Sequence, residues 1–426
     1  MDYEVIPLKS GIKLLAVPMR GLESVSATIW VGVGSRCEPE NIAGISHFLE
    51  HMTFKGGKKY KTAQEVAEAF DQLGAEHNAG TSREWTNFYM KVRKEKLAEG
   101  FEILTDGFRE PLFKEDDIEK ERGSILEEIS MYEDMPMDKV GDYFNEIAFK
   151  GNFLGRDIAG SRETVRKMKK GDFVDFRSEN YVTSNIFVSL AGNFDKNEAV
   201  ELCQKYLSEF PGGSPDNFQK FVSFQEKPQV YLKSKKSEQA HVIFGFQCFP
   251  RSHKLYYPQM ILSTILGRGA SSRLFDEIRW KRGLAYAIYT SSTSYKEVGS
   301  FDTYAGVDIN KVDEVIKLVA EIHKSLADKK SKITTQEMSK AKEFLKGHIA
   351  LSLEDTENAS SFFGERFVKG DEILTPDQVY KKLDEVTEEE VYMTAKELFI
   401  GKRLNVAIVG PYEDRVRFEK LLVDWN

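Results

Sequence analysis

A strand–helix pattern that occurs in both halves of the chain most constrains the fold. Residues 26–33 alternate apolar and small or polar side chains, which predicts a strand, and a helical pattern follows. Residues 241–246 and 257–266 repeat that order, and residues 185–193 and 404–411 each predict a strand entering a turn at the end of a half. Strand–turn–helix units are common, so a chance match is the alternative. The pattern favours a duplicated α+β unit, each copy a mostly antiparallel sheet packed with helices.

Chain length and the position of turn-forming residues predict two domains. The chain has 426 residues, 41% of them hydrophobic, which exceeds one ordinary domain. Prolines and glycines cluster at residues 210–217. We therefore expect one α+β domain at residues 1–212, a linker at 213–224 and a homologous α+β domain at 225–426.

Charge and cysteine content narrow the class of protein. The net charge of −8 argues against nucleic-acid binding, which normally needs a basic face. Three well-separated cysteines argue against a disulfide framework and fit a reducing compartment. The first residues show no basic segment followed by an apolar run, and no apolar run approaches the ~18 residues of a membrane helix. We expect a soluble, cytoplasmic protein without nucleic-acid or membrane partners.

The segment at residues 39–54 carries a candidate metal site. At about 100° per residue, its helical pattern forms one apolar stripe, made of Ile42, Ile45, Leu49 and Met52. His47, Glu50 and His51 fall on the opposite side, where two imidazoles one turn apart can reach the same ion. His-x-x-Glu-His is also the inverted form of the zinc-peptidase motif. A solvated helix face is the alternative, but the chain has only seven histidines, which favours a metal site.

The helical pattern at residues 117–129 offers a third ligand. Its apolar stripe contains Ile118, Ile125 and Ile129. Glu121 and Glu128 flank this stripe two turns apart, whereas Glu127 points away from it. A carboxylate on the buried side needs a partner or a metal ion, so the pattern favours Glu128 as the ligand, with Glu121 as an orienting carboxylate. Ordinary surface glutamates are the alternative.

Residues 47–56 (HFLEHMTFKG), followed by Leu126-Glu127-Glu128-Ile129, resemble the pitrilysin, insulin-degrading enzyme and mitochondrial processing peptidase family. Members of this family are inverted-motif zinc metallopeptidases, and the resemblance covers nearly the whole chain, as in short two-domain bacterial members. Glu128 follows His51 by 77 positions, which suits the family's distal ligand. The resemblance implies an endopeptidase that cleaves peptides or unfolded segments, with Glu50 activating a water. The second half has no such motif, so we expect one zinc per chain.

Further site residues are expected from the resemblance. Arg279 and Tyr286 have the spacing of a family pair that reaches toward substrate, although without the family a surface cation and a packing residue would be the simpler interpretation. Residues 74–89 read as a hairpin. In the family this hairpin supplies an edge strand to which substrate adds as a further strand, and Asn78, Ala79 and Thr81 would line it. A fourth metal ligand is the alternative for His77, which is expected to be a plain turn residue.

The resemblance also bears on partners and on competing functions. The family encloses its site in a chamber of four such domains, so two domains predict a homodimer or a heterodimer with a homologous subunit. A non-catalytic subunit of a processing-peptidase-like heterodimer is one alternative. Another zinc hydrolase, such as a deacetylase, on the same ligands is a second.

Overall fold

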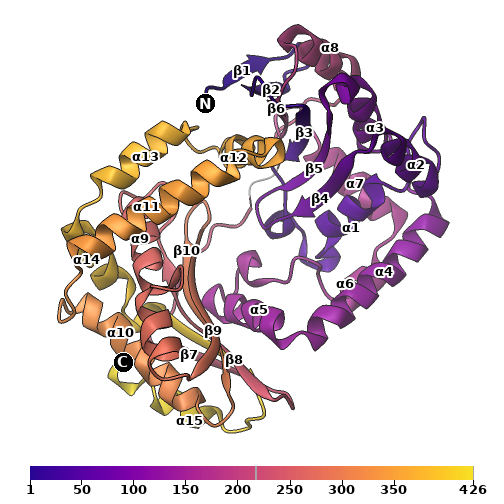
Figure 1. Cartoon of the computed structure of the whole chain (residues 1–426). Coiled ribbons are helices and arrows are strands. Elements are labelled where there is room, and N and C mark those ends of the chain that lie inside the picture. Colours follow the sequence, from indigo (N-terminus) through magenta and orange to yellow (C-terminus); the bar gives the residue numbers. More distant parts are fainter. Residues whose placement is uncertain (216–217, 426) are drawn as a thin grey trace. The chain divides into compact units, whose positions relative to one another are not determined.

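The computed structural model describes residues 1–215 and 218–425, which divide into two compact units (Figure 1). The first unit comprises Met1–Ser130, Arg156–Gln219 and Ile349–Pro376. The second comprises Met131–Gly155, Lys220–His348 and Asp377–Asn426. These units differ from the contiguous domains expected at residues 1–212 and 225–426, because each unit takes one segment from the other half of the chain. Two residues of the expected linker, Asp216 and Asn217, and the final Asn426 lie outside the described residues.

The sheet of the first unit has the order β1-β2-β6-β3-β5-β4. Its strands are β1 (Glu4–Pro7), β2 (Lys13–Pro18), β3 (Ser24–Val31), β4 (Glu76–Thr81), β5 (Thr86–Arg93) and β6 (Ile186–Gly192). β2 and β6 run parallel, and the other neighbours are antiparallel. β4 stands at one edge, paired with β5 as the hairpin that the sequence predicts.

The sheet of the second unit repeats this topology, in the order β7-β11-β8-β10-β9. Its strands are β7 (Gln229–Ser234), β8 (Gln239–Cys248), β9 (Ala285–Ser294), β10 (Gly299–Asp308) and β11 (Leu404–Gly410). β7 pairs with β11 in parallel, and the remaining pairs are antiparallel. This order corresponds, strand by strand, to β2-β6-β3-β5-β4 of the first unit. Equivalent strands have equivalent neighbours and run in the same relative directions. The predicted α+β class with two mostly antiparallel sheets is confirmed.

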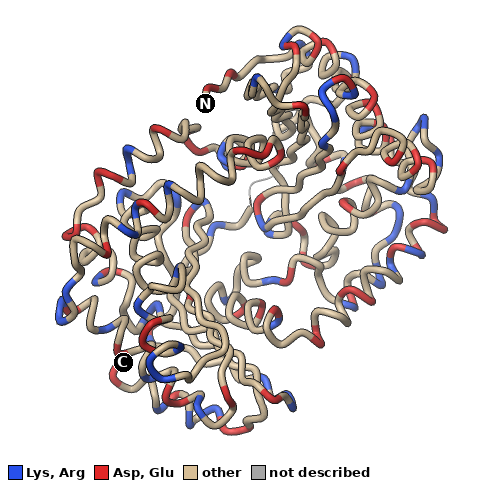
Figure 2. Tube along the Cα trace, viewed as in Figure 1, with Lys and Arg blue, Asp and Glu red and all other residues tan. Residues whose placement is uncertain are grey.

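The helices divide between the two units, and some of them pack directly against the sheets. In the first unit they are α1 (Ile45–Thr53), α2 (Ala63–Leu73), α3 (Leu97–Arg109), α6 (Arg162–Lys167), α7 (Lys170–Asn180), α8 (Lys196–Tyr206) and α12 (Thr356–Val368), with most of α4 (Glu115–Asp134). In the second they are α5 (Pro136–Ala148), α9 (Tyr256–Gly267), α10 (Val312–Ala327), α14 (Glu388–Leu398) and α15 (Arg415–Lys420), with α13 (Pro376–Glu385) and most of α11 (Thr335–Ser352). Acidic and basic residues are interspersed along these helices (Figure 2). In the described part of the chain, no helix is long and apolar enough to cross a membrane.

Two helices pack on the sheet formed mainly by the other half of the chain. α5 follows the first-half strands β1–β5 in sequence, yet its Val140, Phe144 and Ala148 pack in the core of the second unit. α12 lies in the second half and covers β3 and β6 of the first unit. Its Thr356 hydroxyl meets Ser26 Oγ at 3.0 Å, and its Ser360 hydroxyl meets Ser189 Oγ at 2.7 Å. Because each sheet takes a helix from the other half of the chain, the two compact units do not coincide with residues 1–212 and 225–426.

Candidate metal centre

Helix α1 presents the histidine motif on one face and core residues on the other. The helix begins after Gly44, whose φ of 97° lies in the left-handed region that favours glycine. Leu49 and Met52 are buried in the core of the first unit, as the apolar stripe predicts, together with Ile45 and Phe48. Ile42 lies in a short 3₁₀ turn before the helix and packs only partly against this core. The opposite face is left for His47, Glu50 and His51.

Helix α4 supplies the carboxylates. Ile118, Ile125 and Ile129 are buried along one side of this helix, as the sequence predicts. Glu121 is buried beside them and Glu128 is half-buried, whereas Glu127 is exposed. The helix therefore directs two of the three glutamates into the protein.

Three of these side chains converge on a space that suits a metal ion. One ligand atom from each of His47, His51 and Glu128 lies within 4.8 Å of the others. The Oε2 atom of Glu128 is 3.7 Å from Nε2 of His47 and 3.6 Å from Nε2 of His51. The imidazole rings lie 4.6 Å apart between centroids and are inclined by 69°, so their nitrogens approach one point from different directions. Two imidazoles and one carboxylate match the ligand set of catalytic zinc sites.

The ring nitrogen of His51 that faces away from the three-residue cluster contacts Glu121, which in turn pairs with Lys55. Its Nδ1 atom lies 3.1 Å from Oε2 of Glu121, and Oε1 of Glu121 lies 2.5 Å from Nζ of Lys55. A carboxylate on the second ring nitrogen fixes the tautomer in which Nε2 is free to bind a metal. Glu121 thus contacts His51 on the side away from the cluster, and its orienting role stays a prediction.

Burial and charge prepare these groups for a cation. Burial lowers the pKa of His47 to about 4, with a further lowering from His51, so His47 is neutral at pH 7 and available as a ligand. Burial also lowers the pKa of His51, but the Glu121 contact and the charges of Glu50 and Glu128 outweigh it and raise the pKa overall. The pKa of Glu128 is raised, chiefly by burial. A cation between these side chains relieves the cost of burying the carboxylates.

Glu50 lies next to this cluster and has a partner on the edge strand. The hydroxyl of Thr81, the last residue of β4, donates a hydrogen bond of 2.5 Å to Oε2 of Glu50. Burial raises the pKa of Glu50, and the Thr81 hydrogen bond opposes that rise. Asn78 and Ala79 lie on the same edge strand, and the Asn78 carboxamide oxygen accepts a hydrogen bond from the backbone N–H of Ala79.

His77 belongs to strand β4 rather than to a turn. Its ring stacks on Phe70, with centroids 4.0 Å apart and planes inclined by 12°, and its edge meets Phe54. Among the described residues, the histidines, cysteines and carboxylates that gather closely enough for a metal are those of α1 and α4, and His77 is not one of them.

Arg279 and Tyr286 belong to the second unit. Arg279 lies in a π-helix (Phe275–Trp280), a rare helical form that is often found at functional sites. Its guanidinium lies 4.9 Å from the ring centroid of Phe275 and 5.6 Å from that of Tyr286, which holds the two candidate residues next to each other. Tyr286, near the start of edge strand β9, is 74% exposed.

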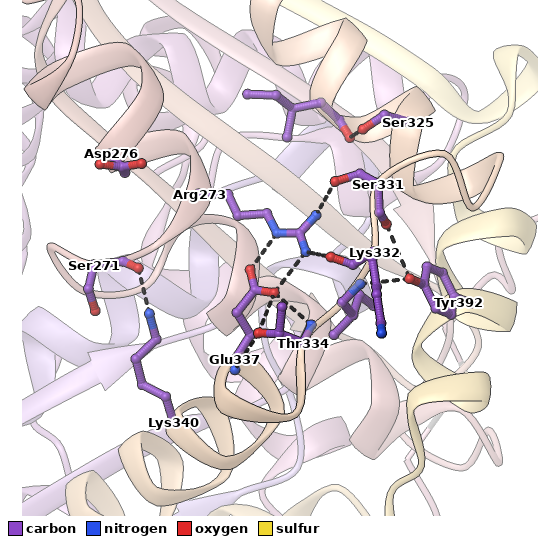
Figure 3. A network of polar contacts seen from close by, with 12 residues as sticks. Ser271, Arg273, Asp276, Ser325, Ser331, Lys332, Thr334, Glu337, Lys340 and Tyr392 are labelled. Atoms are coloured by element: carbon purple, nitrogen blue, oxygen red, sulfur yellow. Dashed lines mark hydrogen bonds and ion pairs between the residues drawn. The ribbon is translucent and has the colours of Figure 1, made fainter.

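A polar network fixes the turn that leads into this π-helix (Figure 3). Arg273 donates to both carboxylate oxygens of Glu337, at 2.6 and 2.9 Å, and to the carbonyl oxygen of Lys332 at 2.7 Å. Lys340 donates to the carbonyl oxygen of Ser271 at 2.6 Å. The network ties the turn that leads into the π-helix to the start of α11.

Two family models match most of the chain. The model described as Insulinase (Peptidase family M16) matches residues 19–162, and the one described as Peptidase M16 inactive domain matches residues 167–345. The chain belongs to peptidase family M16. The resemblance inferred from the sequence motifs is thereby confirmed.

Relatives in this family extend over almost the full length of the chain. An uncharacterised zinc protease of Bacillus subtilis is 33% identical over 95% of this chain and 97% of its own length. One of Rickettsia felis is 31% identical over 97% of this chain and 99% of its own.

Solved structures share the fold. A protease from Helicobacter pylori has a TM-score of 0.90 at 22% identity, covering 96% of this chain and 100% of that one. A chain of complex III2 from Candida albicans has a TM-score of 0.84 at 16% identity, covering 98% and 99%. At these identities the likeness establishes the M16 fold.

Sequence reasoning missed several residues that shape the site. Lys55 stands in the quoted motif, but its contact with Glu121 depends on how α1 and α4 pack. The contact between Thr81 and Glu50 likewise depends on how β4 packs against α1, and the sequence predicts only a place for Thr81 on the substrate strand. Arg36 and Glu38, both 1% exposed, showed no recognisable spacing. The burial of such ionisable side chains can be recognised only from the folded structure.

Proposed function

We propose that this chain is a zinc metallopeptidase that hydrolyses peptides or unfolded polypeptide segments. The convergence of His47, His51 and Glu128 on one space, with Glu50 beside it, carries this proposal. Family M16 membership and relatives named as zinc proteases support it. Each chain would hold one zinc ion, because the described residues gather metal ligands at this one place.

The proposed reaction assigns a separate task to each side chain. His47, His51 and Glu128 hold the zinc, which supplies Lewis-acid chemistry for water and for the scissile carbonyl group. Glu50 accepts a proton from the attacking water and then gives it to the nitrogen of the leaving amine. Glu121 keeps the ring of His51 in place.

Substrate binding is assigned to the edge strand and to the second unit. An extended peptide can add to the free edge of β4 near Asn78 and Ala79, so that backbone hydrogen bonds give affinity with little dependence on sequence. Tyr286 and Arg279, by the family resemblance, donate to the carbonyl oxygen of the substrate as negative charge develops on it.

Replacement of Glu50 tests this mechanism. Glu50→Gln keeps the shape of the side chain and removes the base, so we expect cleavage of a quenched peptide to fall by about 10²–10⁴-fold. Zinc content should stay at one per chain. Glu127→Gln, an exposed change on α4, is the matched control and should leave the rate unchanged. Full activity in Glu50→Gln would contradict the mechanism.

The proposal includes a second subunit that completes a chamber around the site, either an identical chain or a homologous one. Sedimentation of the active enzyme during turnover should then show a dimer, and a monomer alone would contradict this. The non-catalytic alternative is disfavoured because the candidate ligands and Glu50 are all in place. A chelator-sensitive peptide cleavage assay also separates a peptidase from a deacetylase.

A further inference from the structure

We propose that Thr81 is a positioning residue for Glu50, and that a buried brace, residues 34–38, keeps the two side chains in contact. This inference rests on the proposed function, because it takes Glu50 as the base. It assigns Thr81 a role inside the site in place of one in lining the substrate strand.

The hydrogen bond between the two residues determines which carboxylate oxygen is free. Thr81 donates to Oε2 of Glu50 at 2.5 Å, so Oε1 remains available to accept a proton from water. The bond also fixes the rotation of the carboxylate group, which otherwise turns freely about its terminal torsion. Because Oε2 accepts in both protonation states, the contact persists when Oε1 carries the proton.

The alternation of strand β4 directs Thr81 toward α1. Side chains two residues apart on a strand share a face. His77 stacks on Phe70 on that face, and Ala79 packs against the core of the first unit. Thr81 is the next residue of this series, so its hydroxyl points inward to Glu50. Its β-branched side chain has few accessible rotamers, which keeps the hydroxyl in place.

The brace holds the hairpin directly after Thr81. The backbone N–H of Ser35 donates to the carbonyl of Ser82 at 3.1 Å, and that of Arg36 donates to the carbonyl of Arg83 at 3.0 Å. The guanidinium of Arg36 adds an ion pair of 2.7 Å with Glu84, whose side chain is 8% exposed. A side chain at Gly34 would collide with the Ser82 carbonyl, because a Cβ there would lie 2.2 Å from the oxygen.

The same brace holds the start of helix α1. The carboxylate of Glu38 accepts hydrogen bonds from the backbone N–H of Gly44 at 2.6 Å and of Ser46 at 2.8 Å. These groups stand at the first turn of α1, one turn before Glu50, where helix N–H groups need external acceptors. Five consecutive residues therefore connect the helix that carries Glu50 to the hairpin that carries Thr81.

The cost of this arrangement points to a positioning role. Buried charges are expensive even when they are paired, and apolar residues of similar size often stabilise a fold as well or better. Arg36 holds the hairpin through its ion pair with Glu84, and Glu38 holds the start of α1 through the two hydrogen bonds that its carboxyl oxygens accept. The brace thereby fixes the distance between α1 and the edge strand.

The test compares Thr81→Val with Thr81→Ser. Valine keeps the shape and removes the hydroxyl, so we expect kcat to fall roughly ten- to a hundredfold, as for a misplaced catalytic group. KM should stay constant, because the backbone edge of β4 is unchanged. Serine should restore most of kcat. Zinc affinity, measured by chelator competition on the purified protein, should be unaffected in both variants.

Two controls make the result specific. Thr293→Val makes the same change on the exposed side of edge strand β9 and should leave kcat and KM unchanged. In a double variant with Glu50→Gln, Thr81→Val should have little further effect on the residual rate, since residues that act together are not additive. Glu84→Gln weakens the brace at its ion pair and should also lower kcat more than it raises KM.

The outcomes separate this inference from the proposed function. Full activity in Glu50→Gln overturns the proposed function, whatever Thr81 does. A Glu50→Gln variant without activity, together with an unchanged kcat in Thr81→Val, overturns this inference alone. A rise in KM at constant kcat would return Thr81 to substrate binding. Loss of zinc or of the folded state in Thr81→Val would also overturn the positioning role.

Discussion

The two histidines of α1 have different surroundings on the side away from the proposed metal. Nδ1 of His51 meets the carboxylate of Glu121, which Lys55 holds in turn. Nδ1 of His47 is buried and has no hydrogen-bond partner in the part of the chain that the structure describes. The protein therefore controls the orientation and basicity of His51 more directly than those of His47.

Glu121→Gln tests this asymmetry. Glutamine can still accept a hydrogen bond from His51 but has no charge, so we expect zinc affinity to fall by about 10–100-fold, the usual effect of losing an orienting carboxylate. Chelator competition at pH 7 measures it, with Glu127→Gln as the control on the same helix. Unchanged affinity would show that Glu121 serves only to pair with Lys55.

At the residue scale, the sequence predicts groups within one helix better than contacts between elements. Helical periodicity alone placed Glu128 inward and Glu127 outward, because both lie on the same helix as the apolar stripe. The bond from Thr81 to Glu50 joins a strand to a helix 31 positions away. No local pattern specifies that distance, so the same periodicity could not predict it.

Helix α10 contains a histidine that is buried among aromatic rings, and no charged residue among those the structure describes pairs with it. His323 is fully buried, and its ring lies against Phe244, Phe246 and Phe399. Its Nδ1–H donates to the carbonyl of Val319 at 2.7 Å. Burial lowers the pKa of His323 to about 4, so the ring stays neutral in the folded protein well below its usual titration range.

This histidine should make stability depend on pH. Unfolded chains protonate His323 below about pH 6.5, whereas the folded protein resists until about pH 4, so acid favours unfolding across that window. We expect this residue to contribute a loss on the order of 3 kcal/mol between pH 7 and pH 4. His323→Leu should lose less stability on acidification than the wild type in urea unfolding. The control is His348→Gln, a change at an exposed histidine, whose loss of stability on acidification should equal that of the wild type. An equal loss of stability in His323→Leu and the wild type would contradict the prediction.

At the element scale, strands β3, β6, β8 and β11 and the two site helices could be predicted because their apolar periodicities are regular. The π-helix at Phe275–Trp280 could not, because its residues fit an ordinary helical pattern equally well. The turn before it is tied to α11 by the contact of Arg273 with Glu337, residues that are 64 positions apart in the sequence.

At the scale of the whole molecule, the sequence pattern does not predict that α5 and α12 each pack on the sheet of the other half of the chain. Apolar faces show that both helices pack against something, but not which sheet they cover. In the first unit, α12 covers Ser26, Thr28 and Ser189, whose hydroxyls bond to Thr356 and Ser360 of the helix. α12 thus supplies hydrogen-bond partners to these buried hydroxyls, and Ser189 also accepts a hydrogen bond from the indole N–H of Trp30.

This placement of α5 and α12 predicts that neither half of the chain folds alone. A fragment of residues 1–212 lacks α12, so it exposes the face of β3 and β6 and removes the partners that Thr356 and Ser360 give to Ser26 and Thr28. We expect this fragment to bind a hydrophobic dye, to unfold without a cooperative transition and to hold zinc poorly. Fragment 225–426 lacks α5 and should behave in the same way in dye binding and unfolding.

When the two fragments are co-expressed, they should assemble and recover cooperative unfolding and zinc binding, because each brings the helix that the other needs. The intact chain cut by protease within residues 213–224 serves as the control and should stay assembled. Cooperative unfolding of fragment 1–212 alone, with the zinc affinity of the intact chain, would show that α12 is dispensable for the first unit.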